Sequence, residues 1–174
     1  MRLLTSTCIA VMVLSLLMAG EPQSKLAESQ IPPECKAIFD ASGVRIGLCL
    51  HLGCGRQETP ALTALLAQGS RMLVHGLALD DASLSRSRGE IEARGIAGRA
   101  MAEKTELVPL PYLPDLANLI VVEDMTALNT AGITREEVLR VLAPGGALCV
   151  LQNEKWTATV KPRPWRRRRS TTSA

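Results

Sequence analysis

The sequence predicts an α/β domain built on a mostly parallel β-sheet. Short, continuous apolar runs alternate with helix-type segments between residues 47 and 151. Continuous apolar runs are typical of strands that are buried on both faces of a sheet. Because parallel strands need a crossover connection, which is usually a helix, the segments between the runs would cover those faces. We therefore expect a doubly wound sheet with helices on both sides.

Five segments have the composition of such buried strands, since each is dominated by aliphatic residues, alanine or cysteine. They cover residues 47–52, 72–77, 96–102, 116–122 and 147–151. The third segment is the weakest, because it carries Gly98 and Arg99. Pro144, Gly145 and Gly146 predict a turn before the last strand.

Helix signals lie between these strands. Thr59 and Pro60 fit the N-cap and the first position of a helix that Gly69 ends. Thr134 and Glu137 fit a capping box, in which hydroxyl and carboxylate each satisfy a free backbone N–H. The expected helices cover residues 33–41, 60–68, about 81–94 and 134–142.

Composition and charge limit the class of protein. Hydrophobic residues make up 47% of the 174 residues and charged residues 21%, which is sufficient for one packed domain. The formal net charge is +3, but five arginines lie within residues 163–169, so the rest of the chain is mildly acidic. A domain without a basic surface is not expected to bind nucleic acid.

Residues 1–20 have the features of a secretory signal peptide. Arg2 precedes the apolar run 3–18, and Ala19 and Gly20 close it with small residues, as at a cleavage site. The run is short for a membrane span of about twenty residues. We therefore expect no stable membrane span and export to the periplasm or the outside. An uncleaved segment that anchors the protein in the membrane is the alternative. Residues 21–32 are polar and would form a linker.

Cysteine and histidine residues raise the possibilities of disulfides and of a zinc site. Cys49 and Cys149 lie inside apolar runs, where a free cysteine packs as a small hydrophobic residue, so we expect no disulfide framework. The side chains that would suggest zinc are Cys49, His51, Cys54 and His75. Their spacing matches no common structural zinc site, and we expect no metal. A buried histidine bonded to the backbone is the preferred interpretation.

Four stretches carry a resemblance to a known family. In chain order they are "LCLHLGCG", "LVHGLALDD", "LPYLPDLANLIVVEDM" and "VLRVLAPGGALCVL". Together they resemble the successive motifs of class I S-adenosylmethionine-dependent methyltransferases over residues 47–151. The last stretch is the most specific, because a helix ending in L-x-P-G-G before an apolar strand is habitual in that family. The resemblance implies a Rossmann-like sheet with the strand order 3-2-1-4-5.

The end of the chain carries a second resemblance. Methyltransferases of this class normally add a sixth strand and an antiparallel seventh, but few residues follow the fifth strand, so we expect a truncated edge. "NEKWTATVKPRP" is similar to the end of a methyltransferase-like domain that leads into a PQQ-like β-propeller in large exported bacterial proteins. We therefore expect the α/β domain to cover residues 33–157, a disordered basic tail to cover 158–174, and the chain to be a fragment of such a protein.

The resemblance implies a cofactor site at the loop after the first strand. Glycines there would let S-adenosylmethionine approach the backbone closely. An acidic residue after the second strand would bind the ribose, and another would lie near the adenine. Glu123 and Asp124, after the fourth strand, would occupy the region that faces the methyl donor and acceptor. The implied cofactor-binding residues are Gly53, Cys54, Gly55, Asp80, Glu106 and Glu123.

This sequence departs from the family pattern at the same loop. His51 stands at the usual acidic position, and Gln57 stands where a third glycine is expected. The acid that closes the second strand falls on Ala78, so that carboxylate is either displaced to Asp80 or absent. Asp80 and Asp81 also fit plain helix N-cap positions.

Two functions remain open at this stage. The first is transfer of a methyl group from S-adenosylmethionine to an acceptor that the sequence does not identify. The second is a non-catalytic scaffold or interaction domain that keeps the fold. Export favours the second, because S-adenosylmethionine is a cytosolic metabolite. A nicotinamide-dependent oxidoreductase is a weaker third interpretation, since the P-G-G segment fits methyltransferases better.

Overall fold

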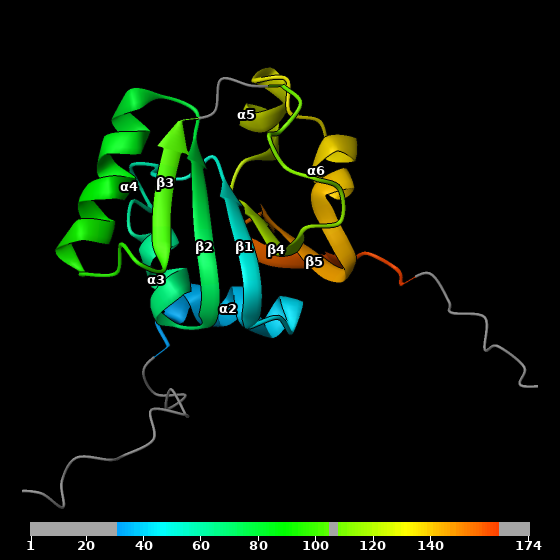
Figure 1. Ribbon diagram of the computed structural model, residues 1–174, viewed down its shortest axis with the longest axis horizontal. Coiled ribbons are helices and arrows are strands. Elements are labelled where there is room, and N and C mark those ends of the chain that lie inside the picture. The colour runs from blue at the N-terminus through cyan, green and yellow to red at the C-terminus, as the bar shows by residue number, and fades with distance from the viewer. Residues whose placement is uncertain (1–30, 105–107, 164–174) are drawn as a thin grey trace, which may run out of the picture.

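The computed structural model describes residues 31–104 and 108–163, which form one six-stranded sheet flanked by helices (Figure 1). The helices are α2 (Pro33–Ser42), α3 (Leu62–Gln68), α4 (Asp81–Ala93), α5 (Met125–Thr130) and α6 (Arg135–Val141). The strands are β1 (Ile46–Leu52), β2 (Arg71–Ala78), β3 (Ala100–Lys104), β4 (Ala117–Val122), β5 (Leu142–Gln152) and β6 (Lys155–Val160). Among the described residues no helix is long and apolar enough to cross a membrane.

The strand order is β3-β2-β1-β4-β5-β6, and every pair except β5 and β6 is parallel. The predicted α/β class and the predicted order of the first five strands are therefore confirmed. Chain order reverses at β1, which pairs with β2 on one side and β4 on the other. This reversal is where ligands bind in open α/β sheets, beyond the carboxyl ends of the strands.

The antiparallel strand β6 was not predicted. It pairs with β5 through a hairpin whose turn residues, Asn153 and Glu154, have φ angles of 48° and 64°. Two consecutive residues with positive φ are what a tight hairpin turn requires. The expected boundary at residue 157 is wrong by at least three residues, since β6 continues to Val160. Residues 164–174 of the expected tail lie outside the described residues.

Helix α5 was not predicted, and three other boundaries differ from the prediction. Strand β5 begins at Leu142, not at 147, so Pro144, Gly145 and Gly146 do not form the predicted turn but lie within the strand, where its register with β4 shifts. The third strand covers Ala100–Lys104 rather than 96–102, because the amides of Arg99 and Ala100 bond the carbonyl of Ile96 and form a turn there. Helix α3 begins at Leu62, and its N-cap position is Ala61. Thr59 is therefore not its N-cap; its hydroxyl donates to a side chain in the site described below.

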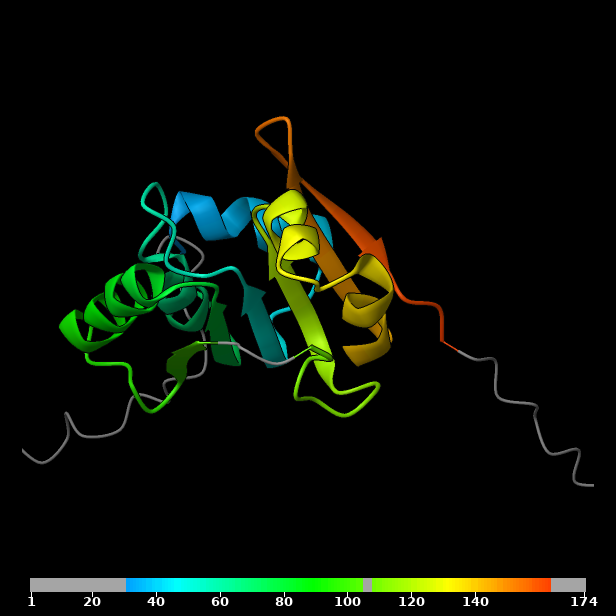
Figure 2. The ribbon, with the colours of Figure 1, turned by 90° about the horizontal axis from the view of Figure 1, so that it is seen from above.

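The core is divided between the two faces of the sheet. On one face, α2, α3 and α4 bury residues that include Phe39, Cys49 and Leu66. On the other face, α5 and α6 contribute Leu128 and Val138 to a second cluster. Figure 2 shows the sheet edge-on, from the end at which the parallel strands finish.

The second face is only partly covered: the carboxyl ends of β1 and β2 are buried there, but the expectation of covering helices is wrong for the amino-terminal parts of these strands and for β3. None of the helices that the structure describes lies in front of β1, β2 and β3 in Figure 1. Ile46, Leu73 and Met101 are 64%, 59% and 49% exposed there. The cause is the connection between β3 and β4, whose described residues, 108–116, contain no helix.

Candidate functional site

A cavity of about 160 Å³ lies beyond the ends of β1, β2 and β4, where the chain order reverses. It is lined by Gly53, Cys54, Arg56, Leu79, Asp80, Ser83, Asp124 and Ala127. We call it the loop cavity. Three of the six predicted cofactor-binding residues, Gly53, Cys54 and Asp80, are therefore brought together by the fold. Parallel strands place their following loops at one edge of the sheet, which is why residues distant in sequence meet here.

The two glycines of the loop have different structural roles. Both have positive φ, 75° at Gly53 and 76° at Gly55. A Cβ added at Gly53 would approach only Leu128 Cδ2, at 3.9 Å, so the backbone is open to a neighbour there. A Cβ added at Gly55 would overlap the carbonyl oxygen of Ser83 at the start of α4. Gly53 thus lines the cavity, whereas Gly55 allows the loop to pack against α4.

The first backbone amides of the loop are already hydrogen-bonded. The N–H groups of Gly53 and Cys54 donate to the carbonyl of Leu77, at 2.8 and 3.0 Å. These bonds fix the loop against the end of β2. They also mean that these two donors are used by the protein itself, so a ligand here would depend on side chains for most of its polar contacts.

The thiol of Cys54 is buried and faces the sheet. Its sulfur lies beside Gly76, where an added Cβ would come within 2.8 Å of it. Burial raises the pKa of this thiol to about 11, although hydrogen bonds with Ser87 and Thr63 act in the opposite direction. Cys54 therefore contributes backbone, not a reactive side chain, to the loop cavity.

The buried cysteines are expected to resist alkylation in the folded protein. Burial raises the pKa of Cys35 to about 12 and that of Cys149 to about 11, and all four described cysteines are free. Only the thiolate reacts, so native protein at pH 8 should leave these thiols unmodified by iodoacetamide. Peptide mass mapping measures this, with protein in guanidinium chloride as the control. Equal labelling of Cys54 in both samples would contradict it.

Asp80 caps helix α4 and lines the loop cavity. Its Oδ1 accepts the Ser83 amide at 2.7 Å and its Oδ2 accepts the Ser83 hydroxyl at 2.8 Å. These hydrogen bonds from Ser83, with a smaller contribution from Arg86, hold the pKa of Asp80 below its usual value. The carboxylate is thus ionised at neutral pH, and each oxygen retains capacity for a further hydrogen bond.

An ion pair between Arg56 and Asp124 lies at the same cavity; Asp124 was expected in this region, but Arg56 and the pairing were not predicted. Arg56 Nη1 lies 3.2 Å from Asp124 Oδ2, and Asp124 also caps α5 by accepting the Ala127 amide at 2.9 Å. The Ala127 amide and Arg56 together lower the pKa of Asp124. Both side chains are partly exposed, at 38% and 41%, so water screens their attraction and the pair can open at modest cost.

Glu123, unlike Gly53, Cys54 and Asp80, does not line the loop cavity. Its side chain is buried; Oε1 lies 3.1 Å from His51 Nε2, and Oε2 accepts the Thr59 hydroxyl. His51 Nδ1 in turn lies 2.8 Å from Thr63 Oγ1, which also accepts from Ser87. His51 is therefore bonded to side chains, not to the backbone as expected, and it links Glu123 and Thr59 on one side to Thr63 and Ser87 on the other in a mostly buried polar chain.

The last predicted residue, Glu106, lies outside the described residues. A second cavity, of about 240 Å³, lies on the other side of the loop, where Glu123 and Thr59 meet Trp156 of β6. Among the described residues, no group of three or more His, Cys, Asp and Glu side chains is placed to hold a metal ion.

Several solved structures have a fold similar to that of this chain. A proposed S-adenosylmethionine-dependent methyltransferase from Methanococcus maripaludis has a TM-score of 0.58 at 22% identity, over 69% of this chain and 54% of that one. The [4+2]-cyclase SpnF has a TM-score of 0.57 at 21% identity, over 66% and 42%. A geranyl diphosphate C-methyltransferase from Streptomyces coelicolor, in complex with S-adenosyl-L-homocysteine, has a TM-score of 0.51 at 18% identity, over 67% and 44%.

The chain thus spans about half the length of these structures and shares their fold. No protein-family model matches the sequence, and no curated protein does. The fold is that of class I methyltransferases, while the chemistry of this chain depends on its own residues.

Proposed function

We propose that this chain is a methyltransferase-type domain that binds S-adenosylmethionine in the loop cavity. The observation that carries the proposal is the position of that cavity at the strand-order reversal, with Gly53 and an ionised Asp80 on its wall. Structures of similar fold have been solved in complex with S-adenosylmethionine or S-adenosylhomocysteine, which supports this choice of ligand.

The lining residues fit the parts of such a ligand. Asp80 can accept hydrogen bonds from a ribose diol, and Leu79 and Ala127 offer apolar surface to a base. Arg56 suits the carboxylate of the amino-acid end, and Asp124 suits its ammonium group. When bound, S-adenosylmethionine would supply an activated methyl group, and the protein would contribute alignment of the methyl carbon with a nucleophile.

The cavity must widen to admit the whole ligand. Its volume of about 160 Å³ is below the roughly 300 Å³ at which ordinary small-molecule sites begin. The Arg56–Asp124 pair lines the cavity and is only partly buried, so separation of these two side chains is the cheapest way to enlarge it. Ligand binding would then replace one ion pair with two others.

The test is a calorimetric titration with S-adenosylhomocysteine, in which we expect micromolar binding. Asp80→Asn should weaken it about 10- to 100-fold, because a hydrogen bond to a charged acceptor contributes about 1.5–3 kcal/mol. Asparagine is an equally good N-cap, so helix α4 should remain intact. Asp81→Asn is the matched control, since Asp81 is the neighbouring acid and pairs with Lys104 outside the cavity.

A non-catalytic scaffold is the second candidate, and specific contacts favour it. The Gly53 and Cys54 amides are satisfied by Leu77, and Glu123 is held by His51 and Thr59. A similar structure is named as a cyclase, so the fold is not restricted to methyl transfer. Absence of binding heat at millimolar S-adenosylhomocysteine would refute cofactor binding and support the scaffold.

We further propose export and a relationship to propeller-containing proteins, on the sequence alone. The support is the apolar segment 3–18 followed by Ala19 and Gly20, and the stretch "NEKWTATVKPRP". Mass analysis of protein from the exported fraction tests the first part. A chain shortened by about twenty residues would indicate a cleaved signal, and a full-length, membrane-bound chain would indicate an anchor instead.

A further inference from the structure

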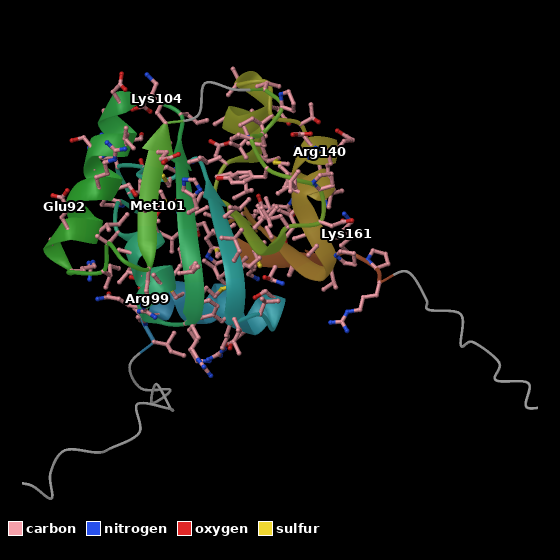
Figure 3. All side chains as sticks on the ribbon, viewed as in Figure 1. Glu92, Arg99, Met101, Lys104, Arg140 and Lys161 are labelled. Atoms are coloured by element: carbon pink, nitrogen blue, oxygen red, sulfur yellow. The ribbon has the colours of Figure 1, made fainter. Side chains whose placement is uncertain are left out.

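The part of the sheet that no helix of the described residues covers carries exposed apolar side chains. We call it the open face: the side of β1, β2 and β3 that is turned toward the viewer in Figure 1. Its exposed apolar side chains are Ile46, Leu73 and Met101. Leu48 and His75 lie between them and are partly covered, His75 by the Tyr112 ring, whose hydroxyl lies 2.7 Å from His75 Nδ1. Figure 3 labels Met101 midway along β3, with Arg99 and Lys104 toward the two ends of that strand.

This face is unusual for a parallel sheet. Parallel strands are normally buried on both sides, because their crossover helices cover both faces. Here Ile46, Leu73 and Met101 are each about half exposed or more. Exposed apolar surface of this kind on a folded domain typically marks an interaction site. Three more exposed apolar residues, Val108, Leu113 and Leu116, lie in the neighbouring connection to β4.

Charges are arranged at opposite ends of the apolar centre. On β2, Arg71 shares the face with Leu73 and His75, since alternate residues of a strand point the same way. On β3, Glu103 shares it with Met101 and lies level with Leu77 at the carboxyl end. Arg71 forms no ion pair within the described part of the chain, and Glu103 is 53% exposed, at 3.5 Å from His75 Nε2.

This pattern is self-complementary. A surface with a cation at one end, an anion at the other and apolar residues between them matches a copy of itself turned by a twofold rotation. When two such sheets pack face to face with their strands antiparallel, Arg71 of one copy approaches Glu103 of the other. Leu73 of each copy then lies over the level of His75 and Met101 in the other.

We propose that the open face is a homodimer interface that packs two copies of this chain sheet to sheet. We choose a second copy as the partner because Arg71 and Glu103 of one copy complement Glu103 and Arg71 of the other. The apolar centre is small, so the dimer should be weak and reversible, at the low end of the size range for specific interfaces. The inference is independent of cofactor binding.

The test measures the mass of the full chain by light scattering or sedimentation over a range of concentrations. The weight-average mass should rise from 18.7 kDa toward twice that value. Leu73→Glu should keep the protein monomeric, and it should fold because Leu73 is already 59% exposed. Val160→Glu is the matched control, since Val160 is 57% exposed on β6, and it should leave dimerisation unchanged.

Charge reversal tests the proposed orientation. Arg71→Glu and Glu103→Arg should each weaken the dimer at least several-fold, and the double variant should regain most of the affinity because the two charges are exchanged. A full chain that stays monomeric at high concentration would overturn the proposal; the face would then be covered by residues 1–30 or by a different partner. A dimer that persists in Leu73→Glu would overturn it as well.

Discussion

Gly55→Ala is expected to destabilise the domain by about 3–4 kcal/mol. Gly55 has a φ of 76°, a conformation that costs other residues about 1–2 kcal/mol. The added Cβ would also overlap the carbonyl oxygen of Ser83, which belongs to the backbone of α4 and cannot rotate away. Forcing extra atoms into a packed site typically costs a further 1–3 kcal/mol. Equilibrium unfolding in urea measures the loss.

Gly43→Ala is the matched control for this substitution. Gly43 has a similar φ of 66°, but a Cβ there would have nothing within 4 Å. Gly43→Ala should therefore lose only the cost of the left-handed backbone conformation, about 1–2 kcal/mol. The difference between the two variants isolates the contact between the loop and α4. Equal losses would show that Gly55 serves only to turn the chain.

His51→Leu is expected to destabilise the domain by about 3 kcal/mol. The imidazole joins Glu123 to Thr63, and both His51 and Glu123 are buried. Without it, Glu123 would keep only the Thr59 hydroxyl as a partner, and a buried carboxylate that loses a partner pays much of its desolvation cost. The free energy of unfolding at pH 7 is the quantity to measure.

A double variant separates this account from simple loss of packing. Adding Glu123→Met to His51→Leu removes the stranded carboxylate, so most of the lost stability should return, as in other exchanges of buried polar pairs for apolar ones. His75→Leu is the control histidine variant. The His75 ring bonds the Tyr112 hydroxyl through Nδ1, at 2.7 Å, but Tyr112 is only partly buried and its hydroxyl can turn to water, so replacement of His75 should cost about 1 kcal/mol, clearly less than that of His51. A His51→Leu variant as stable as the parent would contradict the account.

Local patterns in the sequence were sufficient to predict the parallel sheet and the order of its first five strands. Four of the five parallel strands could be placed because each contains a continuous apolar run, whereas β3, with Glu103 and Lys104, lacks one and was placed too early. Asp80 was predicted as an N-cap because the cap chemistry lies within three residues. The hairpin to β6 was missed because Asn153 and Glu154 are not the usual glycine-containing turn pair. The uncovered face was missed because a missing helix leaves no apolar pattern to recognise.

The site was predicted less well because its contacts are long-range. His51 and Glu123 are 72 positions apart, and Arg56 and Asp124 are 68 apart, so no spacing rule connects them. The sequence showed that His51 stands where the family has an acidic residue, but it did not show that Glu123 is the partner of His51. The hydrogen bonds from the Gly53 and Cys54 amides to the Leu77 carbonyl form because β1 and β2 end beside each other, which the sequence does not show.

The most direct test of the central claim is an amide NMR titration of the full chain with S-adenosylhomocysteine. If the loop cavity holds the ligand, saturable shift changes should concentrate at Gly53, Leu79, Asp80, Ser83 and Ala127, which line it. Leu73 and Met101, on the open face, should not shift. Saturable changes elsewhere with none at Gly53 and Asp80, or no changes at millimolar ligand, would contradict the claim.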